Sequence, residues 1–80
     1  MNEAPAVKKF FKMKAYTGPV AVKELAAKLH AIPGFENVTA GTEHVYFTLT
    51  GASWWDVMYE AQQRMQAKYG TTFGLTPKEV

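Results

Sequence analysis

The stretch from His44 to Gly70, HVYFTLTGASWWDVMYEAQQRMQAKYG, decides the fold, because within it a strand pattern gives way to the longest helix pattern of the chain. Val45, Phe47 and Leu49 alternate with outward residues, which is the period of a strand with one buried face. After a Gly-Ala-Ser turn, apolar side chains recur three and four residues apart along one helical stripe: Trp54, Val57, Met58, Ala61, Met65 and Tyr69. The sequence therefore predicts a strand followed at once by an amphipathic helix that buries its Trp54 side.

Both ends of this helix carry their own signals. Ser53 stands three residues before Asp56, so its hydroxyl can accept a hydrogen bond from an early amide of the helix. The carboxylate of Asp56 then lies at the positive end of the helix dipole. Gly70 can adopt the left-handed conformation that commonly ends a helix. We expect the helix to lie between Ser53 and Gly70.

Lysines decide which side of the first strand is buried. Residues 7–16, VKKFFKMKAY, alternate between two faces, and burying the face with three lysines would take three ammonium groups out of water at a high free-energy cost. Phe11, Met13 and Ala15 are therefore predicted to face the core. The predicted outward face is Lys8, Phe10, Lys12, Lys14 and Tyr16.

The segment after this strand predicts a helix and a hairpin. Thr17-Gly18-Pro19 is a turn that places Pro19 at the first helical position, and Pro33-Gly34 ends the helix. Residues 35–40 and the strand from His44 predict a hairpin closed by the turn 41–43. The buried stripe of the helix is Val22, Leu25, Leu29 and Ile32.

The two ends of the chain carry weaker patterns. Residues 71–76, TTFGLT, suggest a short final edge strand, although the pattern leaves open whether a strand forms there. Residues 1–6 and 77–80 are predicted to be flexible tails. The 80 residues form one domain, 1–80, because a chain of this length supports a single core.

The order strand, helix, strand, strand, helix, short strand predicts an α+β protein with the ferredoxin-like split βαβ fold, an antiparallel sheet carrying two helices on one face. The run KELAAKLHAIPGFENVTAGTEHVYFTLTG, Lys23 to Gly51, together with the YG at Gly70, resembles a heavy-metal-associated domain. That family carries CxxC between its first strand and first helix, where this chain has Tyr16-Thr17-Gly18-Pro19-Val20. The resemblance therefore implies the fold and not the metal activity.

Composition narrows the class of protein. The chain has no cysteine, so it forms no disulfide and has no thiolate metal ligand or cysteine nucleophile. It has no apolar run long enough to span a bilayer, and its N-terminus lacks the apolar core of a signal peptide. We therefore expect a soluble, cytoplasmic protein without a membrane partner. The net charge of +2 is small, but four lysines, Lys8, Lys9, Lys12 and Lys14, lie on one segment.

The uncovered face of the predicted sheet is the first candidate binding surface. It would display Lys8, Phe10, Lys12, Lys14 and Tyr16 beside His44, Tyr46 and Thr48. Aromatic rings interleaved with lysines resemble the platform of an RNA-recognition-motif domain, where bases stack on rings and lysines meet phosphates. The glycine-aromatic signature of that family is absent, since the matching segment reads EHVYFTL. The alternative is that these residues only suit a surface strand and protect it from aggregation.

Trp55 and Tyr59 form a second candidate surface, a shoulder beside the buried stripe together with Gln62 and Gln66. Rings this large can line the margin of the core. Alternatively, they project as an aromatic anchor for a protein partner or for a second copy of the chain.

The residues that usually perform catalysis occur here as single copies. Ser53 is the only serine, Asp56 the only aspartate, and His30 and His44 are the only histidines. Helix capping accounts for Ser53 and Asp56, and His30 suits the end of a helix. We therefore expect no catalytic residue, metal site or cofactor.

These patterns predict a non-enzymatic module that binds another protein as an adaptor, inhibitor or small subunit, with a homodimer as a further possibility. The open sheet face, the Trp55 and Tyr59 shoulder and an exposed strand edge are the surfaces that can serve this role. The alternative function is single-stranded nucleic-acid binding on the face of Phe10 and Tyr46.

Overall fold

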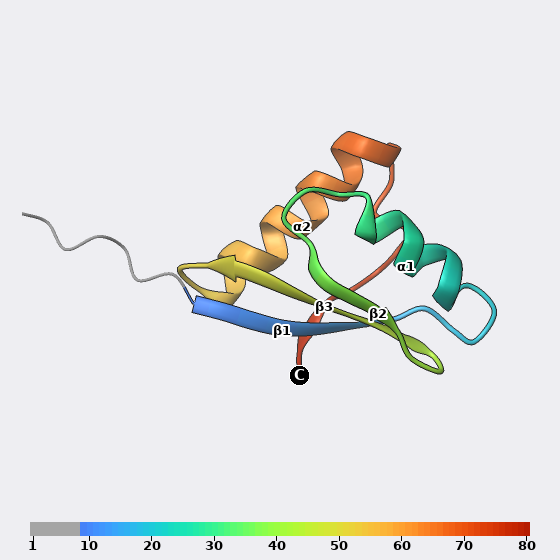
Figure 1. Cartoon of the computed structure of the whole chain (residues 1–80). Coiled ribbons are helices and arrows are strands. Elements are labelled where there is room, and N and C mark those ends of the chain that lie inside the picture. The colour runs from blue at the N-terminus through green and yellow to red at the C-terminus, as the bar shows by residue number, and fades with distance from the viewer. Residues whose placement is uncertain (1–8) are drawn as a thin grey trace, which may run out of the picture.

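The computed structural model of the chain describes residues 9–80 (Figure 1). The predicted tail 1–6 and Lys8 lie outside the described residues. The elements follow one another as β1 (Lys9–Tyr16), α1 (Val22–His30), β2 (Glu36–Ala40), β3 (His44–Gly51), α2 (Trp54–Tyr69) and β4 (Lys78–Glu79). The α+β class predicted from the sequence is confirmed.

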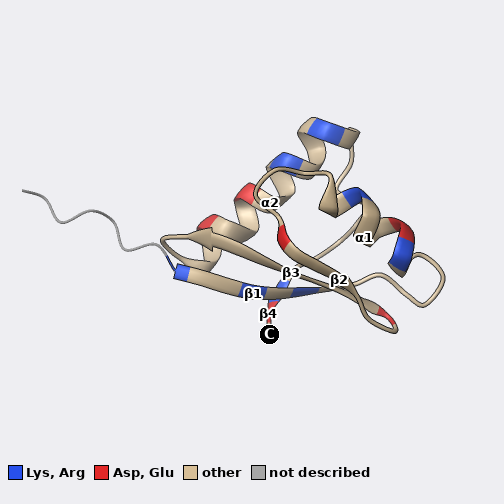
Figure 2. Ribbon diagram, in the orientation of Figure 1, with Lys and Arg blue, Asp and Glu red and all other residues tan. Residues whose placement is uncertain are grey.

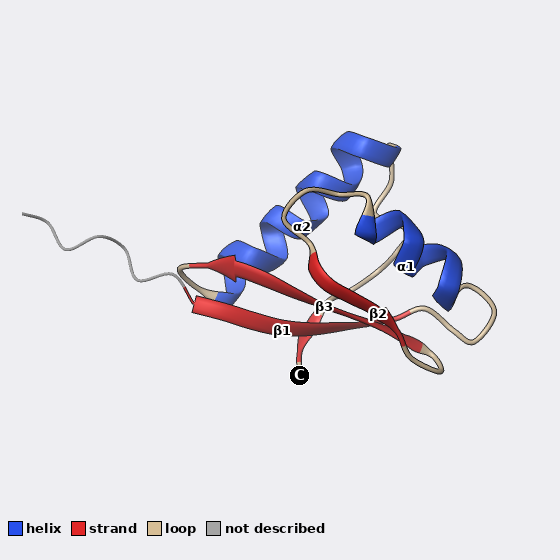
Figure 3. Cartoon of the chain, viewed as in Figure 1, coloured by secondary structure: helices blue, strands red, loops and turns tan. Residues whose placement is uncertain are grey.

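The four strands form one antiparallel sheet in the order β2-β3-β1-β4. The central pair is the longest, because β1 and β3 are in register from Lys9 opposite Gly51 to Tyr16 opposite His44. Both helices lie on the same side of this sheet, as Figures 1 and 3 show. One side of the sheet is therefore covered by helices.

The core forms between that side of the sheet and the helices. Phe11, Met13 and Ala15 of β1 are buried there, as their alternation with lysines predicted. The helices and the other central strand contribute further fully or nearly fully buried side chains: Leu25, Leu29, Val45, Phe47, Leu49, Val57, Ala61 and Met65. Phe10, next to Phe11 in the chain, is 73% exposed on the opposite side. Successive side chains of a strand point to opposite faces, so this alternation is the expected result of burying one face of β1.

Helix α2 has the predicted ends. The Ser53 Oγ accepts a hydrogen bond from the Asp56 amide at 3.2 Å, and Gly70 has a φ of 72° with its amide bonded to the Gln66 carbonyl at 2.8 Å. The predicted burial of Trp54 is only partly correct. This ring is half-buried at the margin of the core, whereas Val57, Ala61 and Met65 are fully buried. The first turn of α2 lies near the end of the sheet, so the sheet covers the Trp54 ring only in part (Figure 1).

Helix α1 begins later than predicted. Ala21 is its N-terminal cap residue, without a side-chain cap bond, and Pro19 lies in the preceding turn rather than at the first helical position. The predicted stripe is nevertheless buried, and Ile32 contributes to the core although it follows the end of the helix. The tight turn at Pro33-Gly34 then leads into β2.

The C-terminal segment differs from the prediction. Residues 71–76 form no strand; instead Phe73 adopts a φ of 58° in a turn, and Leu75 enters the core. The segment 77–80, predicted to be a flexible tail, contains β4, with Lys78 opposite Lys14 and Glu79 opposite Met13. Pro77, immediately before this strand, is fully buried. Anchoring by Leu75 and Pro77 brings the last residues against β1, which local patterning could not indicate.

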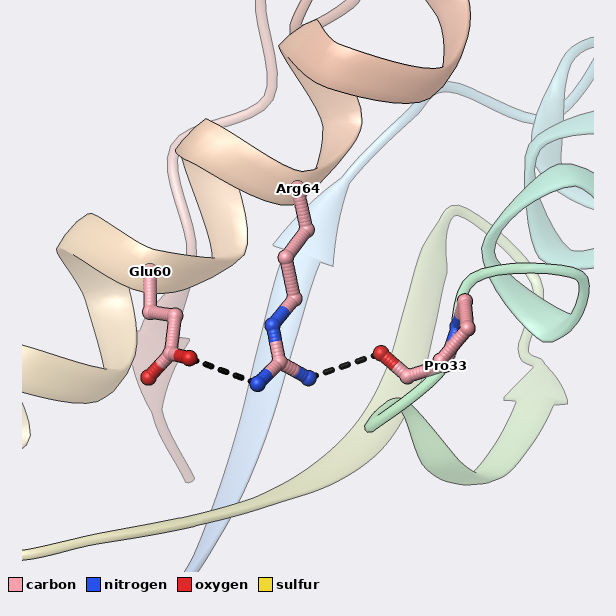
Figure 4. A network of polar contacts seen from close by, with 3 residues as sticks. All are labelled: Pro33, Glu60 and Arg64. Atoms are coloured by element: carbon pink, nitrogen blue, oxygen red, sulfur yellow. Dashed lines mark hydrogen bonds and ion pairs between the residues drawn. The ribbon is translucent and has the colours of Figure 1, made fainter.

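Arg64 ties α2 to the loop that follows α1 (Figure 4). Its Nη1 donates a hydrogen bond to the Pro33 carbonyl at 2.7 Å, and its Nη2 lies 2.6 Å from the Glu60 Oε1. Gly34 has a φ of 95°, and a Cβ added there would lie 1.5 Å from the Arg64 Nη1. The backbone conformation therefore favours glycine, and a side chain at this position would also displace the guanidinium from its place beside Pro33.

The matched pair Phe10 and Phe11 tests the orientation of β1. Phe11→Ala should lower the free energy of unfolding by about 3–5 kcal/mol because it opens a cavity in the core. Phe10→Ala should change the same quantity by no more than about 0.5 kcal/mol, because this ring is exposed. Urea denaturation followed by circular dichroism measures both, with Phe11→Leu as a milder variant if the alanine protein is largely unfolded. Equal losses at the two positions would contradict the orientation.

The Arg64 bridge predicts a difference between two nearby substitutions. Arg64→Met keeps the aliphatic stem but loses the bond to Pro33, so it should lower the free energy of unfolding by about 1 kcal/mol. Glu60→Gln removes only the exposed ion pair and should cost about 0.3–0.5 kcal/mol. Chemical denaturation of both variants separates the contributions. An Arg64→Met protein as stable as the original would show that the bond to Pro33 contributes nothing.

Candidate binding surfaces

The open face is the side of β1 and β3 that lies away from the helices. Cross-strand register places four pairs of side chains on it: Phe10 and Thr50, Lys12 and Thr48, Lys14 and Tyr46, and Tyr16 and His44. The structure thus brings together the residues that the sequence assigned to this face, apart from Lys8. The large apolar rings among them are exposed to different degrees: Phe10 73%, Tyr16 60% and Tyr46 38%.

The aromatic rings of the open face form two groups. Tyr16 and His44 pack edge to face with centroids 5.3 Å apart, and His44 lies 6.3 Å from Tyr46. Phe10 lies at the other end of β1, about 20 Å from Tyr16 at the usual rise per strand residue. The face therefore offers a three-ring cluster at one end and an isolated, highly exposed ring at the other.

The charge on the open face is mostly positive. Lys12 and Lys14 lie on β1, and Lys78 of β4 is directly opposite Lys14. Figure 2 shows the basic positions of β1 in blue. The ion pairs found among residues 9–80 are Lys28 with Glu24 and Arg64 with Glu60, all on the helices. In this part of the chain the lysines of the open face thus have no carboxylate partner. Glu36, in register with Thr48, is an acidic residue on the β2 border of the sheet.

Lys78 was missed as a surface residue because its segment was predicted to be a flexible tail. The available signal was the alternation of Leu75 and Pro77, both buried, with Thr76 and Lys78, both exposed. A proline is tolerated at the start of an edge strand, so Pro77 was compatible with a strand that follows it.

The shoulder of Trp55 and Tyr59 lies on α2, in the layer opposite the open face. Trp55 is 69% exposed and Tyr59 is 64% exposed, so the interpretation that they line the core margin is wrong. Trp55 packs edge to face against Trp54, with centroids 4.9 Å apart. Trp54 thus takes the marginal position, and Trp55 and Tyr59 form a separate exposed aromatic surface.

The strand edges are irregular or short. The pairing of β2 with β3 shifts register between Glu36 and Thr39, where Asn37 has a φ of 53°. On the other side, β4 pairs with β1 at Met13 and Lys14, and the Val80 amide donates to the Lys12 carbonyl. Bulges and short strands are features that disfavour the addition of a further strand.

The single-copy residues considered for catalysis lie on separate elements. At the start of α2, the backbone amide of Asp56 donates a hydrogen bond to the Ser53 hydroxyl. His30 is the last residue of α1, and His44 is the first residue of β3. Across residues 9–80, His, Cys, Asp and Glu side chains form no group of three or more that could hold a metal ion. Within the same range neither helix is both long and apolar enough to cross a membrane.

Comparisons of the chain with protein-family models, with curated proteins and with solved structures each find no match.

The two neighbouring tryptophans predict opposite fluorescence behaviour. A Trp54→Phe protein, whose remaining indole is Trp55, should emit at longer wavelength and be quenched readily by acrylamide, because that ring is exposed. A Trp55→Phe protein should emit at shorter wavelength and be quenched less, because Trp54 is half-buried. Steady-state emission with acrylamide titration measures both. Identical spectra and quenching would contradict the exposed shoulder.

Proposed function

We propose that this chain is a non-enzymatic binding module with the ferredoxin-like split βαβ arrangement. The strand order β2-β3-β1-β4 supports this arrangement, because β3 lies between the two strands that α1 connects. Helix α2 then connects β3 to β4 on the far side of β1. The arrangement leaves one face of the sheet for a partner.

The partner that this surface suits best is another protein with an acidic docking surface, and the chain serves it as an adaptor, inhibitor or small subunit. The observation that carries this proposal is the 73% exposure of Phe10 on a sheet face that also displays Tyr16 and Tyr46. Aromatic side chains give large binding contributions when a partner removes them from water. Lys12 and Lys14 beside them favour carboxylates opposite, which raises the association rate and selects the partner.

Charge also bears on self-association. Two open faces placed against each other would bring the lysines of both copies together, which opposes a symmetric dimer through this surface. On α2, below the shoulder, Glu60 is paired with Arg64, so a shoulder placed against its copy meets less unpaired like charge than two open faces do. Figure 2 shows acidic as well as basic positions along α2. A homodimer is therefore best placed at Trp55 and Tyr59, leaving the open face for a different protein.

Single-stranded nucleic acid is the second candidate ligand of the open face. The specific observation in its favour is that Lys12 and Lys14 lie between Phe10 and Tyr16 along one surface of β1. Lysines can contact phosphates while bases stack on the rings at either side of them. Binding of this kind weakens steeply with salt, because phosphate contacts release counterions.

The test is capture of the partner by three purified forms of the tagged protein: the original, the Phe10→Ser and Tyr46→Ser double variant, and the Trp55→Ser and Tyr59→Ser double variant. We expect a protein that survives nuclease treatment to be captured by the original and by the shoulder variant, and to be lost from the open-face variant. Circular dichroism confirms that each variant is folded. Mass spectrometry then identifies the captured protein.

The other outcomes separate the alternatives. Equal capture by the open-face variant would remove this face as the binding surface, and loss from the shoulder variant would assign binding to Trp55 and Tyr59. Recovery that disappears with nuclease would favour nucleic acid. In that case the affinity for a labelled oligothymidylate, measured by fluorescence anisotropy, should fall steeply as salt is raised.

A further inference from the structure

A depression lies where β1, the start of β3 and the C-terminal segment meet. It is lined by Lys14, Tyr16, His44, Gly74, Thr76 and Lys78 and encloses about 400 Å³. Pockets of roughly 300–1,000 Å³ are the size that takes small organic ligands. None of the lining residues is acidic. Gly74 has a φ of 69°, and a Cβ added there would meet no other atom within 4 Å. At this residue the depression is therefore lined by backbone alone.

Two of the lining residues repel each other. Lys14 and Lys78 are directly opposite one another in the antiparallel ladder, an arrangement that places Cβ atoms about 4.5–5.5 Å apart and is destabilising for like charges. Neither lysine is in an ion pair within the described part of the chain. Glu79 follows Lys78 but points to the other face, since side chains of a strand alternate. A negative charge between the two ammonium groups would remove this repulsion.

The other polar groups of the depression can all donate hydrogen bonds. The Tyr16 and Thr76 hydroxyls each carry one O–H, and the His44 imidazole carries at least one N–H. The ring of His44 is held between Tyr16 and Tyr46, at 5.3 and 6.3 Å. The depression thus combines two positive charges with several neutral donors, which is the set of groups that an oxyanion with several acceptor oxygens requires.

We propose that this depression binds a phosphate group, carried as a monoester on a small organic molecule. The phosphate lies between Lys14 and Lys78 and accepts from the Thr76 hydroxyl, and the organic part contacts the rings of Tyr16 and His44. A lone carboxylate has fewer acceptor oxygens and less charge, and so matches these donors less well. The site does not depend on a macromolecular partner of the open face, and it holds if that proposal fails.

The test is titration of the ¹⁵N-labelled protein with phenyl phosphate and, separately, with inorganic phosphate, followed by NMR. We expect saturable shifts at the amides of the lining residues, with a dissociation constant of about 1 mM for a site of two partly solvated charges. Lys14→Gln and Lys78→Gln should each weaken binding about tenfold, because each removes one charge-assisted contact. Lys12→Gln is the matched control: it removes a lysine from the same strand face outside the depression and should leave the affinity within about twofold.

Sodium chloride at matched ionic strength provides the control for general screening. Tighter binding of phenyl phosphate than of inorganic phosphate supports the monoester, whereas equal or weaker binding would assign the site to the free anion and overturn the organic part of the proposal. Shifts no larger than those with chloride would overturn the site altogether. So would equal affinity in the original, Lys14→Gln and Lys78→Gln proteins, provided that their spectra show the same fold.

Discussion

The cost of burying an ammonium group determines the orientation of β1, and the rest of the structure depends on that orientation. If the lysine face turned inward, Lys12 and Lys14 would lose their hydration without any carboxylate partner. Phe11, Met13 and Ala15 therefore face the helices, and the paired strand β3 must present Val45, Phe47 and Leu49 to the same side. Both helices close over this surface. The same constraint leaves the other side of the sheet uncovered, with its rings and lysines in water.

The surface chemistry follows from this arrangement rather than from any single motif. A central strand whose lysines point outward also has Phe10 and Tyr16 pointing outward, because all of these residues occupy alternate positions of β1 and share one face of the sheet. The edge strand β4 then adds Lys78 beside Lys14 and concentrates positive charge at the end of the sheet where Tyr16 and His44 meet. The acidic residues Asp56 and Glu60 lie on α2 in the opposite layer. The molecule thus presents a basic aromatic face and a separate aromatic shoulder.

The sequence predicted the features that depend on local patterns. Alternation and capping depend on neighbouring residues, and they indicated three features: the orientation of β1, the hairpin of β2 and β3, and the two ends of α2 at Ser53 and Gly70. The sequence failed where distant contacts decide: Leu75 and Pro77 are held in the core by other elements and carry β4 to the edge of the sheet. The start of α1 was misplaced because Pro19 is equally compatible with a turn before a helix. Trp55 lies on α2 away from the buried side chains of Val57, Ala61 and Met65, and the sequence left its burial open because a ring of this size can reach back to the margin of the core.

Solvent paramagnetic relaxation enhancement distinguishes a sheet that has helices on one face and water on the other from a sheet that is covered on both faces. A neutral, soluble gadolinium chelate would be added to isotope-labelled protein. The NMR relaxation rates of the β1 side-chain protons would be recorded with and without the chelate. We expect strong enhancement at Phe10, Lys12 and Tyr16 and weak enhancement at Phe11, Met13 and Ala15, because only the first set faces water. Weak enhancement at both sets, or strong enhancement at the second set, would contradict it.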